Sequence, residues 1–278
     1  VPVWGGSTAD DMFVNEESGG AQWWQLVGRG ESSAGWAIHR WGVVVAALWL
    51  CPGVQVSTLL SAVWGPTIQR GKATRAEGRV LIEIDGRPAG DVLDEWSEGA
   101  VSDAIRACSS PGKKVKPSGG GEGRTIKNHC NLGVNHHVSL IRSFSLMPIA
   151  VTTPQCDRGE GERLVHARML HPGGQVECFG DVAPGMVRLL RAHTNDFPCA
   201  VAAVAHAAVA AAPFQVRGGA VVLCATSVAA LPDQKVLTDA LRLALPEFVC
   251  FFSFGAQGMV DGHTVHGNLM ISLALFGK

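Results

Sequence analysis

The chain has no tyrosine, and only 17% of its 278 residues are charged. Its formal net charge is −1, so it lacks the basic surface that nucleic-acid binding normally requires. The short basic cluster at 113–116 lies among Gly, Pro and Ser and indicates a solvated loop. No apolar run reaches the roughly 20 residues of a transmembrane helix. We therefore expect neither a nucleic-acid partner nor a membrane span.

The chain also lacks paired cysteines of the CxxC type, although it has eight cysteines in all. This spacing argues against a zinc ribbon and against a cysteine-dense secreted scaffold. Cys224 and Cys250 lie in apolar runs, where burial should raise the thiol pKa. Ser253 lacks the G-x-S-x-G pattern of a nucleophile elbow. We therefore expect no enzyme.

The most informative stretch is the C-terminal end of the chain. Two apolar runs, Phe248–Phe254 and Leu269–Phe276, predict two strands that are covered on both faces. The segment between them, 255–268, is polar and rich in glycine. A polar loop on a rigid sheet is a common place for a binding site. We therefore place the candidate site there.

The rest of the chain alternates strand and helix patterns. The patterns predict helices at 89–96, 197–211 and 232–244, and strands at 43–50, 54–60, 79–85, 138–149, 163–170, 176–179 and 220–224. Residues 108–128 read as a flexible linker or insertion, because they combine Gly, Pro, Ser and Lys. We predict an α/β fold, with α+β as the alternative: mixed sheets flanked by helices, in two subdomains or one bilobal domain.

Three blocks of sequence resemble the FIST sensory domain. Gly71–Trp96 resembles the end of its N-terminal half, Phe254–Ser272 resembles the end of its C-terminal half, and Gly5–Asp11 resembles its glycine-rich turn. The resemblance implies an N-terminal half at 1–107 and a C-terminal half at 129–278, on either side of the linker. The chain begins on a strand end, and we expect the family's first strand–helix–strand unit to be missing upstream of Val1.

The resemblance implies a function as well as a fold. It implies a cytoplasmic sensory module that binds an amino acid or a similar small metabolite, with no cofactor. The module would pass a conformational change to a signalling protein, such as a histidine kinase or a cyclic-dinucleotide enzyme. Two alternatives stay open: a haem-binding sensor of nitric oxide, and an interaction module that has lost its ligand.

The candidate ligand-binding residues come from the two glycine-rich segments and the neighbouring strand ends. They are Gly5, Gly6, Ser7, Asp10, Asp11, Cys224, Ser253, Gly255, Gln257, His266 and Asn268. Position 256, where the family often has an acid, is Ala256, which removes a natural partner for a ligand's amino group. Asp10 and Asp11 are read either as ammonium ligands or as turn caps. His266 is read either as a ligand contact or as a ring that bonds a loop carbonyl.

The haem alternative depends on histidine. The candidate axial ligands are His136, His166 and His263. No spacing fixes a further ligand beside any of them. His136 and His137 are adjacent in a predicted strand, so they point to opposite faces and cannot both serve one site without a kink.

Overall fold

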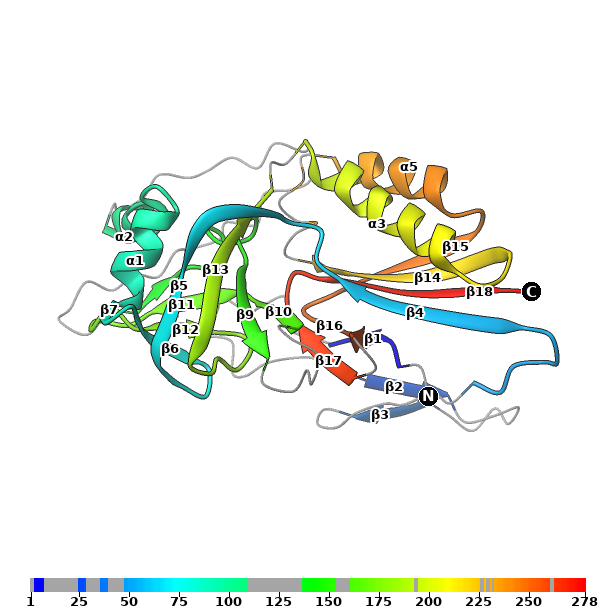
Figure 1. Ribbon diagram of the computed structural model, residues 1–278, viewed down its shortest axis with the longest axis horizontal. Coiled ribbons are helices and arrows are strands. Elements are labelled where there is room, and N and C mark those ends of the chain that lie inside the picture. Colours follow the sequence, from blue (N-terminus) through cyan, green and yellow to red (C-terminus); the bar gives the residue numbers. More distant parts are fainter. Residues whose placement is uncertain are drawn as a thin grey trace. The chain divides into compact units, whose positions relative to one another are not determined.

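The computed structural model describes residues 3–7, 25–28, 36–39, 48–109, 137–153, 161–192, 195–225, 228, 231, 233–260 and 263–278 (Figure 1). The chain divides into two compact units. The first unit combines Val1–Val63 with Thr194–Lys278, and the second unit is Trp64–His193. Apart from Cys108 and Ser109, the predicted linker lies outside the described residues. The predicted division into homologous halves at this linker stays a prediction.

The first unit contains a four-stranded mixed sheet. Its strands, in spatial order, are β15 (Phe248–Ser253), β14 (Val216–Cys224), β18 (Ile271–Gly277) and β4 (Gln55–Ser61). β14 and β15 are parallel, and the other two pairs are antiparallel. Parallel neighbours need a crossover connection. The helix α5 (Gln234–Ala244) supplies it, since it lies between β14 and β15 in the chain.

Two helices, α3 (Phe197–Ala211) and α5, cover one face of this sheet and pack against each other (Figure 1). Pro198 stands in the first turn of α3, where its missing N–H costs nothing. The N-cap residue of α3, Asp196, makes no side-chain capping hydrogen bond. α5 begins with a true cap: the Asp233 carboxylate accepts from Lys235 N at 2.8 Å.

A small three-stranded sheet lies on the opposite face of the four-stranded sheet. It consists of β1 (Gly5–Gly6), β16 (Ala256–Val260) and β17 (His263–Gly267), in the order β1-β16-β17. The hydroxyl of Ser272 on β18 donates to the backbone oxygen of Gln257 on β16 at 2.7 Å, which joins the two layers. The predicted loop 255–268 is therefore mostly a β-hairpin. A separate hairpin joins β2 (Gln25–Gly28) to β3 (Trp36–His39).

The C-terminal strands differ in how well they are covered. β18 is buried almost throughout, as predicted. β15 is only half covered: Val249, Phe251 and Phe252 are 55%, 51% and 50% exposed. The prediction of two covered faces is wrong for β15 because this strand forms an edge of the sheet. The predicted buried strand 43–50 also fails at its end, since Leu48–Leu50 form no strand and are exposed; residues 43–47 lie outside the described part.

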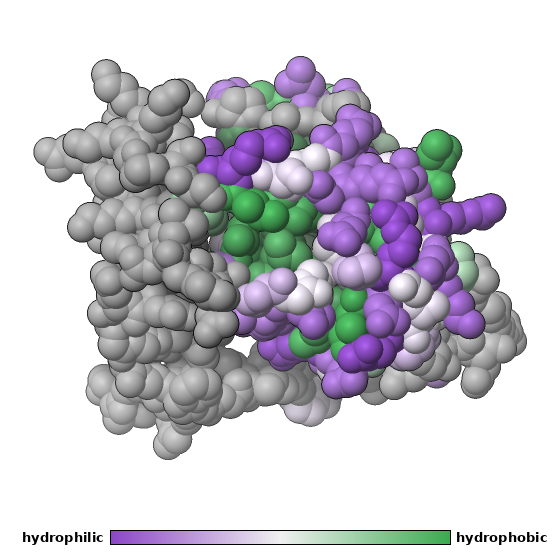
Figure 2. Space-filling model, turned by 90° about the vertical axis from the view of Figure 1, so that its left-hand side faces the viewer, coloured by the Kyte–Doolittle hydropathy of each residue, from purple (hydrophilic) through white to green (hydrophobic). Residues whose placement is uncertain are grey.

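The second unit is built on a nine-stranded antiparallel sheet. Its strands are β5 (Gly65–Glu77), β6 (Val80–Ile84), β7 (Arg87–Pro88), β8 (Val138–Ser139), β9 (Ile149–Thr153), β10 (Gly161–Val165), β11 (Ala167–Leu170), β12 (Val176–Cys178) and β13 (Gly185–Arg191). The helices α1 (Ala89–Trp96) and α2 (Ala100–Ser109) complete it. Figure 2 shows the face of the molecule that lies at the left of Figure 1, where hydrophilic side chains lie beside an apolar area.

One apolar cluster holds the second unit together, with contributions from the sheet and from both helices. The predicted strand 79–85 and helix 89–96 are confirmed, and the turn between them places Asp85 and Gly86 at φ 50° and 77°. The predicted strand 138–149 is wrong in its middle. Leu140 and Phe144 are fully buried, but they lie in turns between β8 and β9. An apolar run can therefore fill a core without forming a strand.

The predicted α/β class with mixed sheets and flanking helices is confirmed. Within the described residues, no helix has the length and apolar character to cross a bilayer. Cys108 at the end of α2 is disulfide-bonded, and the free thiols in the described part are Cys51, Cys178, Cys199, Cys224 and Cys250.

Candidate functional site

The candidate site lies at the carboxyl ends of β14 and β15. These strands are the only parallel pair among those that the structure describes, and their last residues, Cys224 and Ser253, are neighbours in the register. In α/β sheets, ligands bind outside the carboxyl ends of parallel strands. Two of the predicted site residues therefore stand where this fold class usually places a ligand.

The N-terminal segment reaches the same place from the other end of the sequence. Ser7 N donates to the Gly255 oxygen at 2.9 Å, and Phe254 N donates to the Ser7 oxygen at 3.0 Å. Gly6 lies directly over β15, because a Cβ added there would stand 2.6 Å from Ser253 Oγ. Glycine is thus the residue that allows this close approach. The predicted grouping of Gly5–Ser7 with the C-terminal segment is present in the structure.

Three polar side chains form a short hydrogen-bonded chain at this point. Gln257 Nε2 donates to Ser7 Oγ at 2.6 Å, and Ser7 Oγ lies 3.4 Å from His266 Nε2. The Ser7 oxygen accepts from Gln257, and it can either donate to His266 Nε2 or accept from it, according to the tautomer of the ring. Gln257 and His266 are held side by side by the β16–β17 register.

Asn268 carries a buried acceptor without a partner. Asn268 is 2% exposed, and its Nδ2 donates to the Phe254 oxygen at 3.4 Å. Its Oδ1 is buried and accepts no hydrogen bond from the residues that the structure describes. A buried oxygen without a donor is unfavourable by about 1–3 kcal/mol. A bound water or ligand N–H would remove that cost.

Packing around Gly255 fixes the position of the histidine ring. A Cβ at Gly255 would lie 2.4 Å from His266 Nε2, so the ring rests against bare backbone. Ser253 Oγ donates to the Gly255 oxygen at 2.8 Å and holds the same turn. Ala256 is fully buried. The cluster is therefore assembled from uncharged side chains.

Two cysteines lie in the sheet near the site, and they differ in burial: Cys224 is buried and Cys250 is half-buried. Cys224 is 3% exposed at the end of β14, where it is the register neighbour of Ser253. Burial raises the pKa of the Cys250 thiol on β15 to about 11. That thiol is protonated at neutral pH, as expected for a structural cysteine.

The remaining candidates are elsewhere or outside the described residues. Asp10, Asp11 and His136 lie outside the described part. His263 is exposed at the start of β17. His166 lies in the core of the second unit, 1% exposed, with Nε2 2.9 Å from the Ile141 oxygen. Burial lowers the His166 pKa to about 4, so its ring is neutral at physiological pH.

Sequence reasoning missed one supporting residue. Ser272 holds β16 onto β18 through the Gln257 backbone oxygen, and it is fully buried. The sequence does point to Ser272, since it is the one polar residue in the apolar run 269–276. A buried hydroxyl needs a partner, and a single serine in a covered strand therefore indicates a polar contact. In the described residues, no group of three or more His, Cys, Asp or Glu side chains is placed to hold a metal ion.

Comparison with known families matches the FIST N domain to residues 1–87. The matched range contains the Gly5–Asp11 turn and most of the Gly71–Trp96 block, whereas the Phe254–Ser272 block lies outside it. Neither the curated proteins nor the solved structures contain a match to this chain. Residues 1–87 of this chain are therefore similar to the FIST N domain, and the match covers less than half of the chain.

Proposed function

We propose that this chain is a sensory module of signal transduction that binds a small ligand at the carboxyl ends of β14 and β15. The FIST N domain supports the signalling role. The observation that carries the ligand site is the uncharged cluster of Ser7, Gln257, His266 and Asn268, which strands from both ends of the chain bring together. Its role is binding, without catalysis or a resident cofactor.

The chemistry of the cluster favours a ligand with several hydrogen-bonding groups. Asn268 Oδ1 is a buried acceptor that a ligand N–H can satisfy. A free amino acid or a similar small metabolite has such donors and also acceptors for the serine hydroxyls. The buried Ala256 supplies no counter-charge. Recognition would therefore depend on neutral hydrogen bonds rather than on an ion pair.

Signalling requires that the ligand prefer one of two conformations. β1 is only two residues long and is attached by Ser7 to the turn that precedes β16. A ligand that bridges Ser7 and Asn268 would favour the arrangement in which β1 is attached. The signalling partner, such as a histidine kinase or a cyclic-dinucleotide enzyme, would respond to this preference in the cytoplasm.

A thermal-shift panel tests the proposal. The twenty amino acids and a set of small carboxylic acids are added to the purified chain at millimolar concentration. A ligand at a hundred times its Kd stabilises the folded state by about 2.7 kcal/mol. At roughly 2–4 °C per kcal/mol for a chain of this size, that stabilisation corresponds to a rise in Tm of roughly 5–11 °C.

Two variants connect any such rise to the cluster. Gln257→Leu removes the donor to Ser7 and should abolish the rise in Tm. Thr264→Ala lies on the same hairpin but is exposed, and it should keep the rise. The proposal fails if no compound raises the Tm of the folded protein, or if both variants respond like the unchanged chain.

A further inference from the structure

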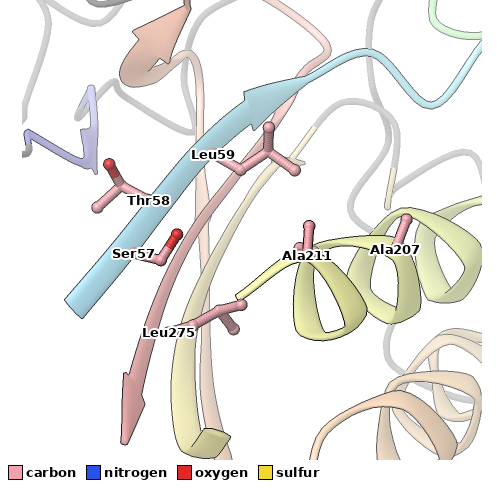
Figure 3. Close-up of a pocket in the computed structure, with 7 residues that line it drawn as sticks. Ser57, Thr58, Leu59, Ala207, Ala211 and Leu275 are labelled. Carbon is pink, nitrogen blue, oxygen red and sulfur yellow. The ribbon is translucent and has the colours of Figure 1, made fainter. Parts of the chain in front are cut away.

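A groove separates the edge strand β4 from the helix α3 in the first unit. It has a volume of about 230 Å³ and is lined by Ser57, Thr58, Leu59, Ala207, Ala208, Ala211 and Leu275 (Figure 3). Ser57 and Leu59 point from β4 towards α3, whereas Thr58 lies on the other side of the strand. The alanines of α3 are too short to fill this space. The groove is thus mainly apolar and open beside a strand edge.

Among the described strands, none pairs with the outer edge of β4. β4 is the last strand of its sheet, and its sequence Gln55–Ser61 contains no charge, proline or glycine. Natural edge strands usually carry such residues, because an unpaired row of N–H and C=O groups attracts another strand. The edge strand β10 of the second unit follows this rule with Glu162 and Arg163. β4 is therefore suited to accept one more strand.

A segment that could pair with this edge lies just before it in the chain. Leu48, Trp49 and Leu50 are 63%, 89% and 38% exposed, three large apolar residues in a row. The turn that follows brings Val54 N to the Cys51 oxygen at 3.0 Å, with Gly53 at φ +86°. Such a turn reverses the chain, so that the residues before Cys51 can run antiparallel to β4.

We propose that Leu48–Leu50 folds back onto the free edge of β4 as an added antiparallel strand and covers the groove. With Pro52 and Gly53 as the two turn residues, Leu50 pairs with Gln55 and Leu48 pairs with Ser57. Residues that pair directly share one face of a sheet. Because Ser57 points into the groove, the Leu48 side chain enters it as well.

The turn also explains why this pairing exchanges with the open arrangement of the structure. Proline at the second position and a left-handed glycine at the third define a type II turn. Its twist does not match that of a two-residue hairpin. Docking of the strand thus gains apolar contacts, but the geometry of the turn disfavours the docked arrangement. Leu48–Leu50 is consequently a strap that opens and closes over the β4 edge.

The chain's own segment is favoured over a strand from a second molecule by its tether. Only four residues, 51–54, separate the segment from β4. A tether this short keeps the local concentration of the segment in about the millimolar range or above. A second copy would have to exceed that concentration in solution. The inference does not rest on the proposed ligand.

Disulfide trapping tests the strap in the full chain, with the exposed Cys51 replaced by serine in every arm. Leu48→Cys with Ser57→Cys should link within one molecule under mild oxidation. Leu48→Cys with Thr58→Cys lengthens the tether by one residue and places the second thiol on the other side of β4. The first pair should link at least tenfold faster than the second, as measured by peptide mapping of the non-reduced monomer.

Equal rates for the two pairs would overturn the proposal. Links between molecules in place of links within one molecule would also overturn it, and would assign the groove to a second copy. Hydrogen exchange gives an independent reading without added cysteines. Leu48→Asp should speed exchange of the β4 amides several-fold, whereas the exposed control Leu243→Asp on α5 should leave them unchanged. Identical β4 exchange in the two variants would contradict the strap.

Discussion

The two units of this chain are stabilised in different ways. The second unit has one large apolar cluster, and ion pairs such as Arg188–Glu162 and Arg168–Glu177 lie on its strands. The described ion pairs of the first unit are confined to the exposed side of α5, at Asp239. The first unit instead has neutral hydrogen bonds at its strand ends and uncharged sheet edges. The second unit therefore resembles a scaffold, whereas the surfaces that we propose to interact lie on the first unit.

The largest expected effect is in the core of the second unit. Leu81→Ala removes a fully buried side chain from the apolar cluster and should destabilise the unit by about 2–5 kcal/mol. Chemical denaturation measures the loss. Ile68→Ala is the matched control, because Ile68 is 91% exposed on the same sheet and should change stability by less than about 0.5 kcal/mol. A small effect of Leu81→Ala would show that the cluster does not hold this unit.

Acid should destabilise the second unit through His166. Its folded pKa of about 4 lies below the ordinary 6.5, so the unfolded chain binds the proton more readily. The stabilisation is complete above pH 6.5 and is lost as the pH falls from 6.5 towards 4, by about 3 kcal/mol in all. The measurement is the free energy of unfolding against pH for the unchanged chain and for His166→Gln. The variant should lose this part of the pH dependence; parallel curves would contradict the assignment.

In the first unit, Gly255→Ala should force the His266 ring away from its place. The added Cβ would stand 2.4 Å from His266 Nε2. We therefore expect the free energy of unfolding to fall by about 1–3 kcal/mol. Gly5→Ala is the control, since its Cβ would make an ordinary contact of 3.6 Å with Gln257. Combining Gly255→Ala with His266→Ala should recover part of the loss. Strict additivity of the two changes would show that the ring and the glycine are not coupled.

The smallest effect is expected for a surface ion pair of the second unit. Glu162→Gln breaks the pair with Arg188. The Glu162 side chain is 33% exposed and the Arg188 side chain is 40% exposed. Pairs of this kind contribute up to about 1 kcal/mol, and salt weakens them. The difference in the free energy of unfolding between the variant and the unchanged chain should therefore be smaller at high salt than at low salt. A loss that persists at high salt would indicate that the ion pair has a larger role in the scaffold.

Local patterns predicted the elements whose residues alternate clearly. The strand at 79–85, its Asp-Gly turn and the following helix are all readable from sequence, because each residue's local preference agrees with the fold. The hairpin β16–β17 was missed although Asp261–Gly262, between its strands, is a strong hairpin signal. Its strands mix polar and apolar residues without a regular period, and the glycines suggested a loop.

The positions of strands and side chains within the fold were harder to predict from the sequence. Nothing in the run Phe248–Phe254 reveals that β15 lies at the edge of a sheet, so its half exposure could not be predicted. The site residues were chosen from two glycine-rich segments, and the structure brings those segments together. The contact of Ser7 with Gln257, 250 positions apart, depends on the whole first unit. Sequence can nominate such residues, but only the fold can pair them.

Hydrogen exchange with and without ligand tests the central claim most directly. The probe is the amino acid or small acid that gives the largest rise in Tm, added at a hundred times its Kd. We predict slower exchange in peptides covering Gly5–Ser7 and Ser253–Asn268, with no change in β6 of the second unit. A rise in Tm accompanied by protection only in the second unit would contradict the assignment of the ligand site to the strand ends of the first unit.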